Sequence, residues 1–551
     1  MKVKKIFLCV ITMALLVYLI PISTKANEQK KDYIILLDDS KSRDLELEEK
    51  NEAVKRKILG FKNYLNEIGI TVLDNYDYES VPIIEILANS EELNKINNTS
   101  IKIIENESVP IESYEDSSSL FKCQSTTVPD TEYKKTVLGN ALWNQGYRGS
   151  GVKVAVFDTG GSYHDDLKIS GATTFVSNEN WKDYEYHGTH VSGIIAGKKY
   201  GVAPEAQLYI IKTLSKGVSD HNQRVDVLTR SIDWAIKNKI KIVNMSYGYE
   251  SDTSFLSSKQ KEGLNEIFKK GYDNGLLFVA AAGNYGKTNN KNVRFPASSP
   301  HVIAVSNTVG GGGINDTSSI GPKIELSAPG TNLYSTVPYD KDTDSYFDCW
   351  DGTKNGYMDL SGTSMSAPVV SGIAALLYQK YPHANNVQIR DYLKFMAKKK
   401  TGLSNGVLVY GKNDEYGYGL VQGDIGNSID KKITINNSAY LHTMPDINYK
   451  TPYNVSTQTV RAIRELNGWY EIETWQGHRW INGMGTFIGE FKVKLYQEST
   501  NLYNEKEGSL TGGSLSPQTV TATRRSGSWF EVKTTYGTRW IKPYYYSLSQ
   551  N

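Results

Sequence analysis

The chain has 551 residues, more than a single hydrophobic core usually supports, so several domains are expected. Hydrophobic residues make up 39% and charged residues 22%, a composition that excludes a disordered chain and a membrane-embedded one. The formal net charge of +2 gives no electrostatic reason to expect nucleic acid as a partner.

The N-terminus has the three parts of a secretory signal peptide. Three lysines among the first five residues precede an apolar run over 6–20, and Thr24 and Ala26 supply small residues before a predicted cleavage. The run is short for a membrane span, and an uncleaved anchor is the alternative. No later segment is apolar enough to span a membrane. We therefore predict a signal peptide over 1–26 and a secreted mature protein with no membrane span.

The cysteines define no disulfide framework. Cys9 lies within the predicted signal peptide, which leaves Cys123 and Cys349. These two could pair in an oxidising compartment, but processing after Cys123 would leave Cys349 as a lone thiol. No cysteine-protease signature surrounds either residue, so neither is a candidate nucleophile.

Residues 27–120 are predicted to form a small α+β unit. The polar stretch from 112 to 119 that ends it is typical of an exposed linker suited to proteolysis. The expected elements are a strand over 33–37, a helix over 47–65 and strands over 81–87 and 101–104.

Strands and helices alternate from 121 to 428, which predicts an α/β domain with a mainly parallel sheet flanked by helices. In such sheets active sites lie at the C-terminal ends of the strands. Three buried strands, expected over 152–157, 240–245 and 276–281, are followed by the polar residues Asp158, Ser246 and Asn284.

An internal repeat follows the α/β domain. Residues 458–481 align without gaps to 518–541, and half of the aligned positions are identical. Short alternating strands with turn signals predict two small all-β units, 429–487 and 488–551.

Hydrolysis of an amide by a serine needs a base, a carboxylate that orients the base, and donors for the developing oxyanion. Ser364 is expected near a helix N-terminus, because Pro368 is tolerated only in a first helical turn. Free backbone N–H groups there favour negative charge. The segments that supply these parts are Asp158-Thr159-Gly160, His187-Gly188-Thr189-His190, Ala281-Ala282-Gly283-Asn284 and Gly362-Thr363-Ser364-Met365-Ser366-Ala367-Pro368.

These four segments, in this order, resemble those of the subtilisin-like (subtilase) serine proteases over about 130–428. The resemblance implies that Asp158 orients His187, that His187 is general base and then general acid, and that Ser364 is the nucleophile. Asn284 and the backbone N–H of Ser364 would form the oxyanion hole, with no cofactor required for catalysis. Alone, each residue could cap a turn or a helix. His190 is expected to pack or hydrogen-bond locally instead of joining the reaction.

The same resemblance implies the substrate contacts. An extended peptide is expected to add to a strand edge. Arg294 would face the base of the pocket for the residue before the cleaved bond and favour an acidic side chain there; the alternative is that it turns to solvent or pairs with a local carboxylate. The residues expected to form the walls of the substrate pocket (the wall residues) are Ser246, Tyr247, Gly248, Ala282 and Gly283.

Two departures from the family concern calcium. The loop after the His187 segment is short and carries Lys198 and Lys199, so the family's calcium site is expected to be absent there. An acidic insert over 338–357 has the oxygen-ligand spacing of a calcium loop, but Ser345 replaces the expected glycine and no helix flanks it. A solvated acidic loop is the alternative. The candidate ligands are Asp340, Asp342, Asp344, Asp348 and Asp351.

The flanking units complete the prediction. The 27–120 unit resembles a subtilase propeptide, which implies an intramolecular chaperone and inhibitor removed by self-cleavage between 112 and 128. The repeats resemble bacterial SH3-like modules, which implies retention at a cell-wall polymer through aromatics stacked on sugars; small hydrophobic cores are the other use of these rings. They are Trp469, Trp475, Trp480, Trp529, Tyr536 and Trp540.

The predicted function is therefore a secreted serine endopeptidase made as a zymogen and acting on protein or peptide substrates. A wall-binding protein with a degenerate protease domain is the alternative from another class. Within the protease class, broad proteolysis and processing of one dedicated partner stay open.

Overall fold

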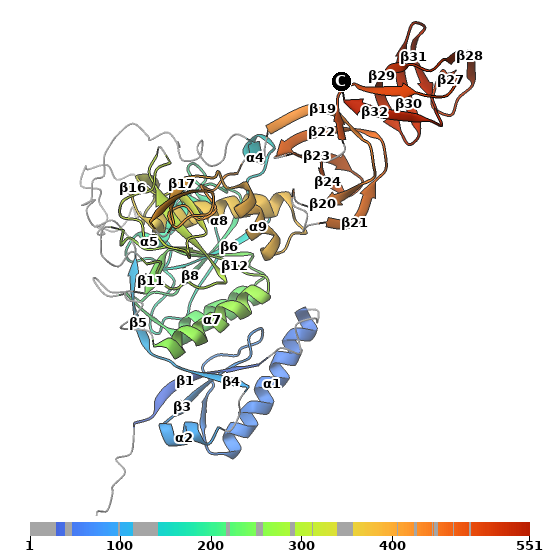
Figure 1. Cartoon of the computed structure of the whole chain (residues 1–551). Helices are drawn as coiled ribbons and strands as arrows, with labels where there is room; N and C mark the ends of the chain where they lie inside the picture. Colours follow the sequence, from blue (N-terminus) through green and yellow to red (C-terminus); the bar gives the residue numbers. More distant parts are fainter. Residues whose placement is uncertain are drawn as a thin grey trace, which may run out of the picture.

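The computed structural model describes three successive parts of the chain (Figure 1). Outside the described residues lie the predicted signal peptide, Cys123, Cys349 and all five aspartates of the acidic insert. The described residues are 29–38, 47–96, 100–113, 141–215, 221–249, 257–286, 292–310, 312–338, 356–404, 406–423, 427–443, 445, 450–466, 468–483 and 486–550.

The N-terminal part is an antiparallel four-stranded sheet with one long helix. The strand order is β2-β3-β1-β4. The strand predicted over 33–37 and the helix predicted over 47–65 are confirmed, and each is two residues longer than expected. The elements are β1 (Lys31–Leu37), α1 (Leu47–Glu67), β2 (Thr71–Leu73), β3 (Ile83–Ala88), α2 (Ser90–Asn94) and β4 (Ile101–Glu105).

A seven-stranded sheet forms the centre of the molecule, in the order β14-β13-β12-β10-β6-β8-β7. Every pairing within it is parallel, as predicted for this domain. Its strands are β6 (Lys153–Asp158), β7 (Ile169–Thr174), β8 (Gln207–Lys212), β10 (Ile242–Met245), β12 (Leu277–Ala281), β13 (Val302–Thr308) and β14 (Leu326–Pro329).

Helices cover both faces of this sheet. Along β6, Val154 and Val156 belong to one core cluster, and Ala155 and Phe157 belong to the other. The first cluster includes α5 and α8; the second includes α6, α7 and the N-terminal sheet. The helices are α4 (Ala141–Asn144), α5 (His187–Ala196), α6 (Val225–Lys237), α7 (Ser258–Asp273), α8 (Thr363–Lys380) and α9 (Asn386–Met396).

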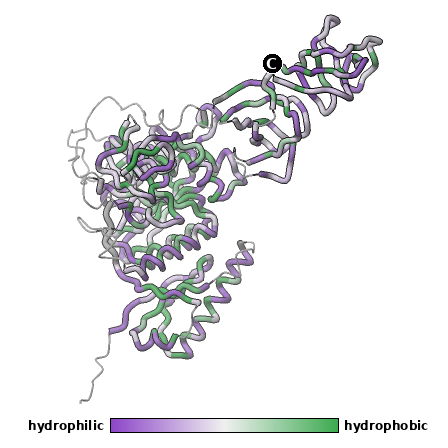
Figure 2. The backbone as a smooth tube through the Cα atoms, in the orientation of Figure 1, coloured by the Kyte–Doolittle hydropathy of each residue, from purple (hydrophilic) through white to green (hydrophobic). Residues whose placement is uncertain are grey.

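Helix α8 runs through the interior and is buried on all sides over its first four turns. In Figure 2 this central region is the richest in hydrophobic residues. No helix among the described residues is long and apolar enough to cross a membrane. Two hairpins lie beside this core: β15 (Leu333–Thr336) with β16 (Tyr357–Leu360), and β17 (Thr401–Ser404) with β18 (Val407–Tyr410).

A three-stranded sheet joins the N-terminal part to the central domain. Its middle strand β5 (Ser108–Ser113) pairs antiparallel with β11 (Tyr247–Tyr249) and with β9 (His221–Arg224). The sequence predicts an exposed linker from 112, but Glu112 and Ser113 belong to this strand. That part of the prediction was wrong, because the partner strands lie more than a hundred residues away in sequence.

The C-terminal part consists of two antiparallel seven-stranded units with matching strand orders. The first has the order β21-β20-β24-β23-β22-β19-β25 and the second β28-β27-β31-β30-β29-β26-β32, so the internal repeat is also a structural repeat. The first contains β19 (Asn427–Ile435), β20 (Ala439–His442), β21 (Lys450–Val455), β22 (Thr459–Leu466), β23 (Trp469–Thr474), β24 (Gly477–Asn482) and β25 (Thr486–Ile488). The second contains β26 (Phe491–Leu495), β27 (Thr500–Tyr503), β28 (Leu510–Leu515), β29 (Thr519–Ser526), β30 (Trp529–Thr534), β31 (Gly537–Ile541) and β32 (Tyr546–Gln550).

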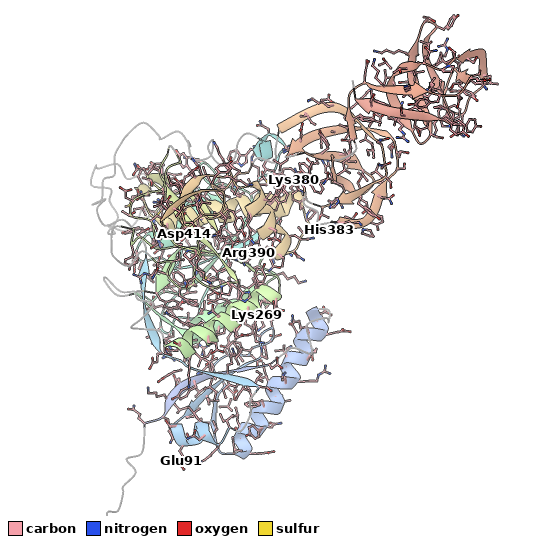
Figure 3. All side chains as sticks on the ribbon, in the orientation of Figure 1. Glu91, Lys269, Lys380, His383, Arg390 and Asp414 are labelled. Carbon is pink, nitrogen blue, oxygen red and sulfur yellow. The ribbon has the colours of Figure 1, made fainter. Side chains whose placement is uncertain are left out.

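The first C-terminal unit is docked on the end of α8. Trp480 is fully buried and belongs to the core cluster of the central domain. Beside it Glu471 forms buried ion pairs with Lys380 at 3.4 Å and with Arg464 at 3.2 Å. Figure 3 shows Lys380 and the nearby His383 at this junction. Trp480 is therefore a packing residue, and its predicted use as a sugar-stacking surface is wrong.

Candidate active site

Asp158 and His187 are brought together by the start of α5 and the end of β6. Asp158 is the last residue of β6 and His187 is the first residue of α5. The Nδ1 of His187 lies 2.7 Å from Oδ1 of Asp158, and both side chains are buried. The backbone N–H of Thr159 also donates to this oxygen, at 2.8 Å. Because a carboxylate only accepts, Nδ1 carries the proton and Nε2 is left as the basic nitrogen.

Ser364 lies in the first turn of α8, as its sequence context predicts. Its hydroxyl donates to the carbonyl oxygen of Ser246 at 2.7 Å, and the hydroxyl of Ser246 donates to the carbonyl of Ser364 at 2.8 Å. This reciprocal pair fixes the start of α8 against the residue that follows β10. The backbone N–H groups of this first turn are those that a helix leaves without an internal acceptor.

Asn284 follows β12 and faces the same helix start. Its Oδ1 accepts from the backbone N–H of Thr363 at 3.0 Å and from the Thr363 hydroxyl at 3.1 Å. These two bonds orient the amide. Its Nδ2 is buried and has no hydrogen-bond partner among the described residues. A buried donor without an acceptor is costly, so Nδ2 is a donor that an incoming acceptor could pair.

Asp183 is a site residue that the sequence analysis missed. Its carboxylate accepts from the hydroxyl of Thr159 at 3.0 Å and from the backbone N–H and hydroxyl of Thr189 at 2.8 and 2.6 Å. The Thr159 hydroxyl in turn accepts from the backbone N–H of Gly188 at 3.0 Å. Burial raises the pKa of the Asp183 carboxyl. The network ties the loop after Asp158 to the first turn of α5; an aspartate just before a helix start was the available signal.

His190 has the local role that its sequence position suggests. Its ring is fully buried, and Nε2 donates to the carbonyls of Met358 at 2.9 Å and Leu333 at 3.1 Å. Burial lowers the pKa of His190 to about 3, so this ring is neutral at any working pH. It supports the hairpin β15–β16 and does not titrate with the His187 site.

The residues predicted to line the substrate pocket flank Ser364 on two sides. Ser246 to Gly248 lie on the β10 side, and β11 carries the paired strand β5, with Gly248 opposite Glu112 and Tyr247 opposite Ser113. The side chain of Tyr247 is buried, and its hydroxyl accepts from Nε2 of Gln223 at 3.0 Å. Only the backbone of Tyr247 therefore lies on the strand edge.

The second wall is fixed to the start of α8. The backbone N–H of Gly283 donates to the hydroxyl of Thr363 at 3.1 Å. The carbonyl of Ala282 accepts from the backbone N–H of Arg294 at 3.0 Å, and the Arg294 side chain is only 3% exposed. The structure thus brings Arg294 beside this wall and away from solvent.

The short loop after α5 is closed by protein contacts. The ammonium of Lys198 donates to the carbonyl of Asp165 at 2.5 Å, and the backbone N–H of Lys199 donates to the Asp166 carboxylate at 2.9 Å. Within the described ranges, no group of three or more His, Cys, Asp or Glu side chains could hold a metal ion. The calcium predictions for this loop and for the acidic insert stay predictions.

Comparison with known proteins shows the family of the chain. Residues 149–419 match the Subtilase family. The thermostable alkaline protease of Halalkalibacterium halodurans is 34% identical, over 66% of this chain and 86% of that protein. M-protease of Shouchella clausii is 32% identical, over 73% of this chain and 93% of its own length. Minor extracellular protease Epr of Bacillus subtilis is 38% identical over 51% of this chain, which spans only 39% of Epr. The chain therefore belongs to the subtilase family and is a subtilisin-like serine endopeptidase.

Proposed function

We propose that the chain cleaves peptide bonds with Ser364 as nucleophile, His187 as general base and then general acid, and Asp158 as the carboxylate that orients His187. The observation that carries this proposal is the 2.7 Å contact between Nδ1 of His187 and the buried Asp158. It sets the tautomer in which Nε2 can take the hydroxyl proton of Ser364. Asn284 and the backbone N–H of Ser364 are the proposed oxyanion donors.

We propose the following reaction, in which the Ser364 hydroxyl first turns from the carbonyl of Ser246 toward Nε2 of His187. Nε2 of His187 removes the proton as Oγ of Ser364 attacks the peptide carbonyl, and the resulting oxyanion takes a hydrogen bond from Nδ2 of Asn284. The imidazolium then gives its proton to the leaving amine, which leaves an acyl ester on Ser364. A water molecule, deprotonated by His187, releases the acid product by the reverse steps.

The N-terminal part is proposed to be an inhibitory propeptide. Its strand β5 pairs with β11, the edge on which an extended substrate would bind. Its sheet is also fixed to α6. Asp233 accepts from the backbone N–H groups of Ser80 and Val81 at 2.7 and 3.0 Å, and Arg230 donates to the Glu85 carboxylate at 2.9 and 2.5 Å.

The register of β5 narrows the expected cleavage position. β5 runs antiparallel to β11 and ends at Ser113, opposite Tyr247. The next residue toward β10 is Ser246, whose carbonyl accepts the hydroxyl of Ser364. We therefore expect the propeptide to be cut within 114–117, a narrower range than the 112–128 that the sequence suggests.

Secretion and synthesis as a zymogen complete this proposal.

Retention at a cell-wall polymer is the second candidate function. The observation that favours it is the exposure of one aromatic ring at equivalent turns of the two C-terminal units. Trp475 is 66% exposed and Tyr536 is 76% exposed. Trp529 is buried, and its ring packs edge-on against Tyr503 of the same unit. A pull-down on purified cell walls would test this, with a Trp475→Ala, Tyr536→Ala double variant expected to lose binding.

The proposed nucleophile can be tested with a serine-directed phosphonate probe on wild-type and variant chains whose N-terminal part has been removed by an added protease of another class. We expect the probe to label the wild type, and Ser364→Ala to abolish labelling. Ser366→Ala is the matched control, because Ser366 lies in the same helical turn but its hydroxyl donates to the carbonyl of Ala328 at 3.0 Å. Labelling of Ser364→Ala, or no labelling of the wild type, would reject the proposal and favour a degenerate protease domain.

A further inference from the structure

Arg294 is a buried cation with unused donors beside the proposed active site. Its side chain is 3% exposed, and its guanidinium carbon lies 3.9 Å above the centre of the Tyr285 ring. The Nε and Nη1 groups are buried and have no hydrogen-bond partner among the described residues. The sequence left open whether Arg294 turns to solvent or pairs with a local carboxylate. The burial rules out the first, and no ion pair to it exists within the described residues.

Burial of these unpaired N–H groups of Arg294 lowers the stability of the fold unless a hydrogen-bond acceptor binds them. A guanidinium carries five N–H donors and stays charged at every working pH. Donors left unpaired in a buried position cost their full desolvation penalty, and the Tyr285 ring offsets only part of it. Nε and Nη1 of Arg294 are therefore donors that an anionic, planar acceptor could pair.

The position of Arg294 connects this site to the reaction. Its backbone N–H is bonded to Ala282, and Tyr285 directly follows Asn284, the proposed oxyanion donor. On its other side, the carbonyl of Phe295 accepts from the backbone N–H of Tyr249 at 2.8 Å. The Arg294 segment thus joins β11, the proposed substrate strand, to the wall that ends at Asn284.

We propose that Arg294 makes this enzyme prefer glutamate or aspartate as the residue on the acyl side of the cleaved bond. The inference rests on the proposed function, because it assigns the side-chain pocket of that same site. A carboxylate fits the guanidinium through two parallel N–H···O bonds, which also gives geometric selectivity. Burial strengthens the attraction, since the surrounding dielectric is lower than that of water.

The test uses peptides that are identical except for glutamate, glutamine, leucine or lysine before the cleaved bond. Glutamate and glutamine have nearly the same shape, so their kcat/KM ratio isolates the charge. We expect the mature wild type to favour glutamate over glutamine about tenfold or more. Arg294→Gln should bring this ratio near one, and Arg294→Glu should shift the preference toward lysine.

The control variant is Arg461→Gln, which removes one positive charge from an exposed arginine on β22 and should keep the wild-type ratio. Labelling by the phosphonate probe confirms that each variant is folded. A wild type that is labelled but cleaves leucine or glutamine peptides as well as glutamate peptides would overturn the Arg294 inference and leave the proposed function standing. A wild type that neither takes the label nor cleaves any peptide would overturn the proposed function and, with it, this inference.

Discussion

Replacement of Asp158 by asparagine tests the orientation of His187 most sharply. The carboxylate is fully buried and bonded to His187 Nδ1 at 2.7 Å. An asparagine amide can turn its N–H₂ toward Nδ1, and the ring then carries its proton on Nε2, which can no longer accept the hydroxyl proton of Ser364. We therefore expect a loss in kcat with little change in KM.

The magnitude follows from the burial of the pair. Removing one partner of a buried charged pair costs about 3–5 kcal/mol, and here that cost falls on the transition state, in which His187 is protonated. At about 1.4 kcal/mol for each factor of ten, kcat should fall roughly 10²- to 10⁴-fold. Initial rates on a chromogenic peptide measure this. Asp165→Asn, an exposed carboxylate a few residues away, is the control. A kcat for Asp158→Asn within threefold of wild type would refute the reasoning.

Three further predictions concern stability. Trp480→Ala should cost about 3–5 kcal/mol and lower Tm more than Trp540→Ala, its half-buried counterpart in the second unit; equal shifts would contradict the docking on α8. Burial raises the pKa of Asp359 to about 6, so the wild type loses stability as pH rises through 6, whereas Asp359→Asn does not. The Tm of Asp359→Asn minus the Tm of the wild type should therefore increase from pH 4.5 to pH 7.5. A difference that stays constant over this range would reject the prediction. If the acidic insert binds calcium, a chelator should lower Tm, and an unchanged Tm would support a solvated loop.

The sequence predicts the parallel central sheet and the contact between Asp158 and His187 because both depend on local patterns. The continuous apolar strand before Asp158 indicates a doubly covered parallel strand, and Pro368 limits where α8 can begin. Asp158 and His187, separated by 29 positions, meet as expected. Asp158 ends β6 and His187 begins α5, so the polar end of a parallel strand meets the start of a helix.

Contacts between distant segments could not be predicted in the same way. The pairing of β5 with β11 depends on an unpaired strand edge in another domain, and no local pattern in the polar stretch from 112 reveals it. Trp480 aligns with Trp540 in the repeat, but only Trp480 meets a neighbouring domain. Asp183 has only a weak sequence signal, its place just before a helix start, and its role depends on contacts with Thr159 and Thr189 that the sequence does not reveal.

Catalysis by Ser364 and self-processing are tested most directly by expressing wild type and Ser364→Ala in a protease-free host and comparing chain size and N-terminal sequence. The wild type is expected to lose its N-terminal part, with a new N-terminus produced by a cut within 114–117. The variant should accumulate as an uncleaved precursor of 27–551. Equal maturation of the Ser364→Ala chain would contradict self-processing by this site.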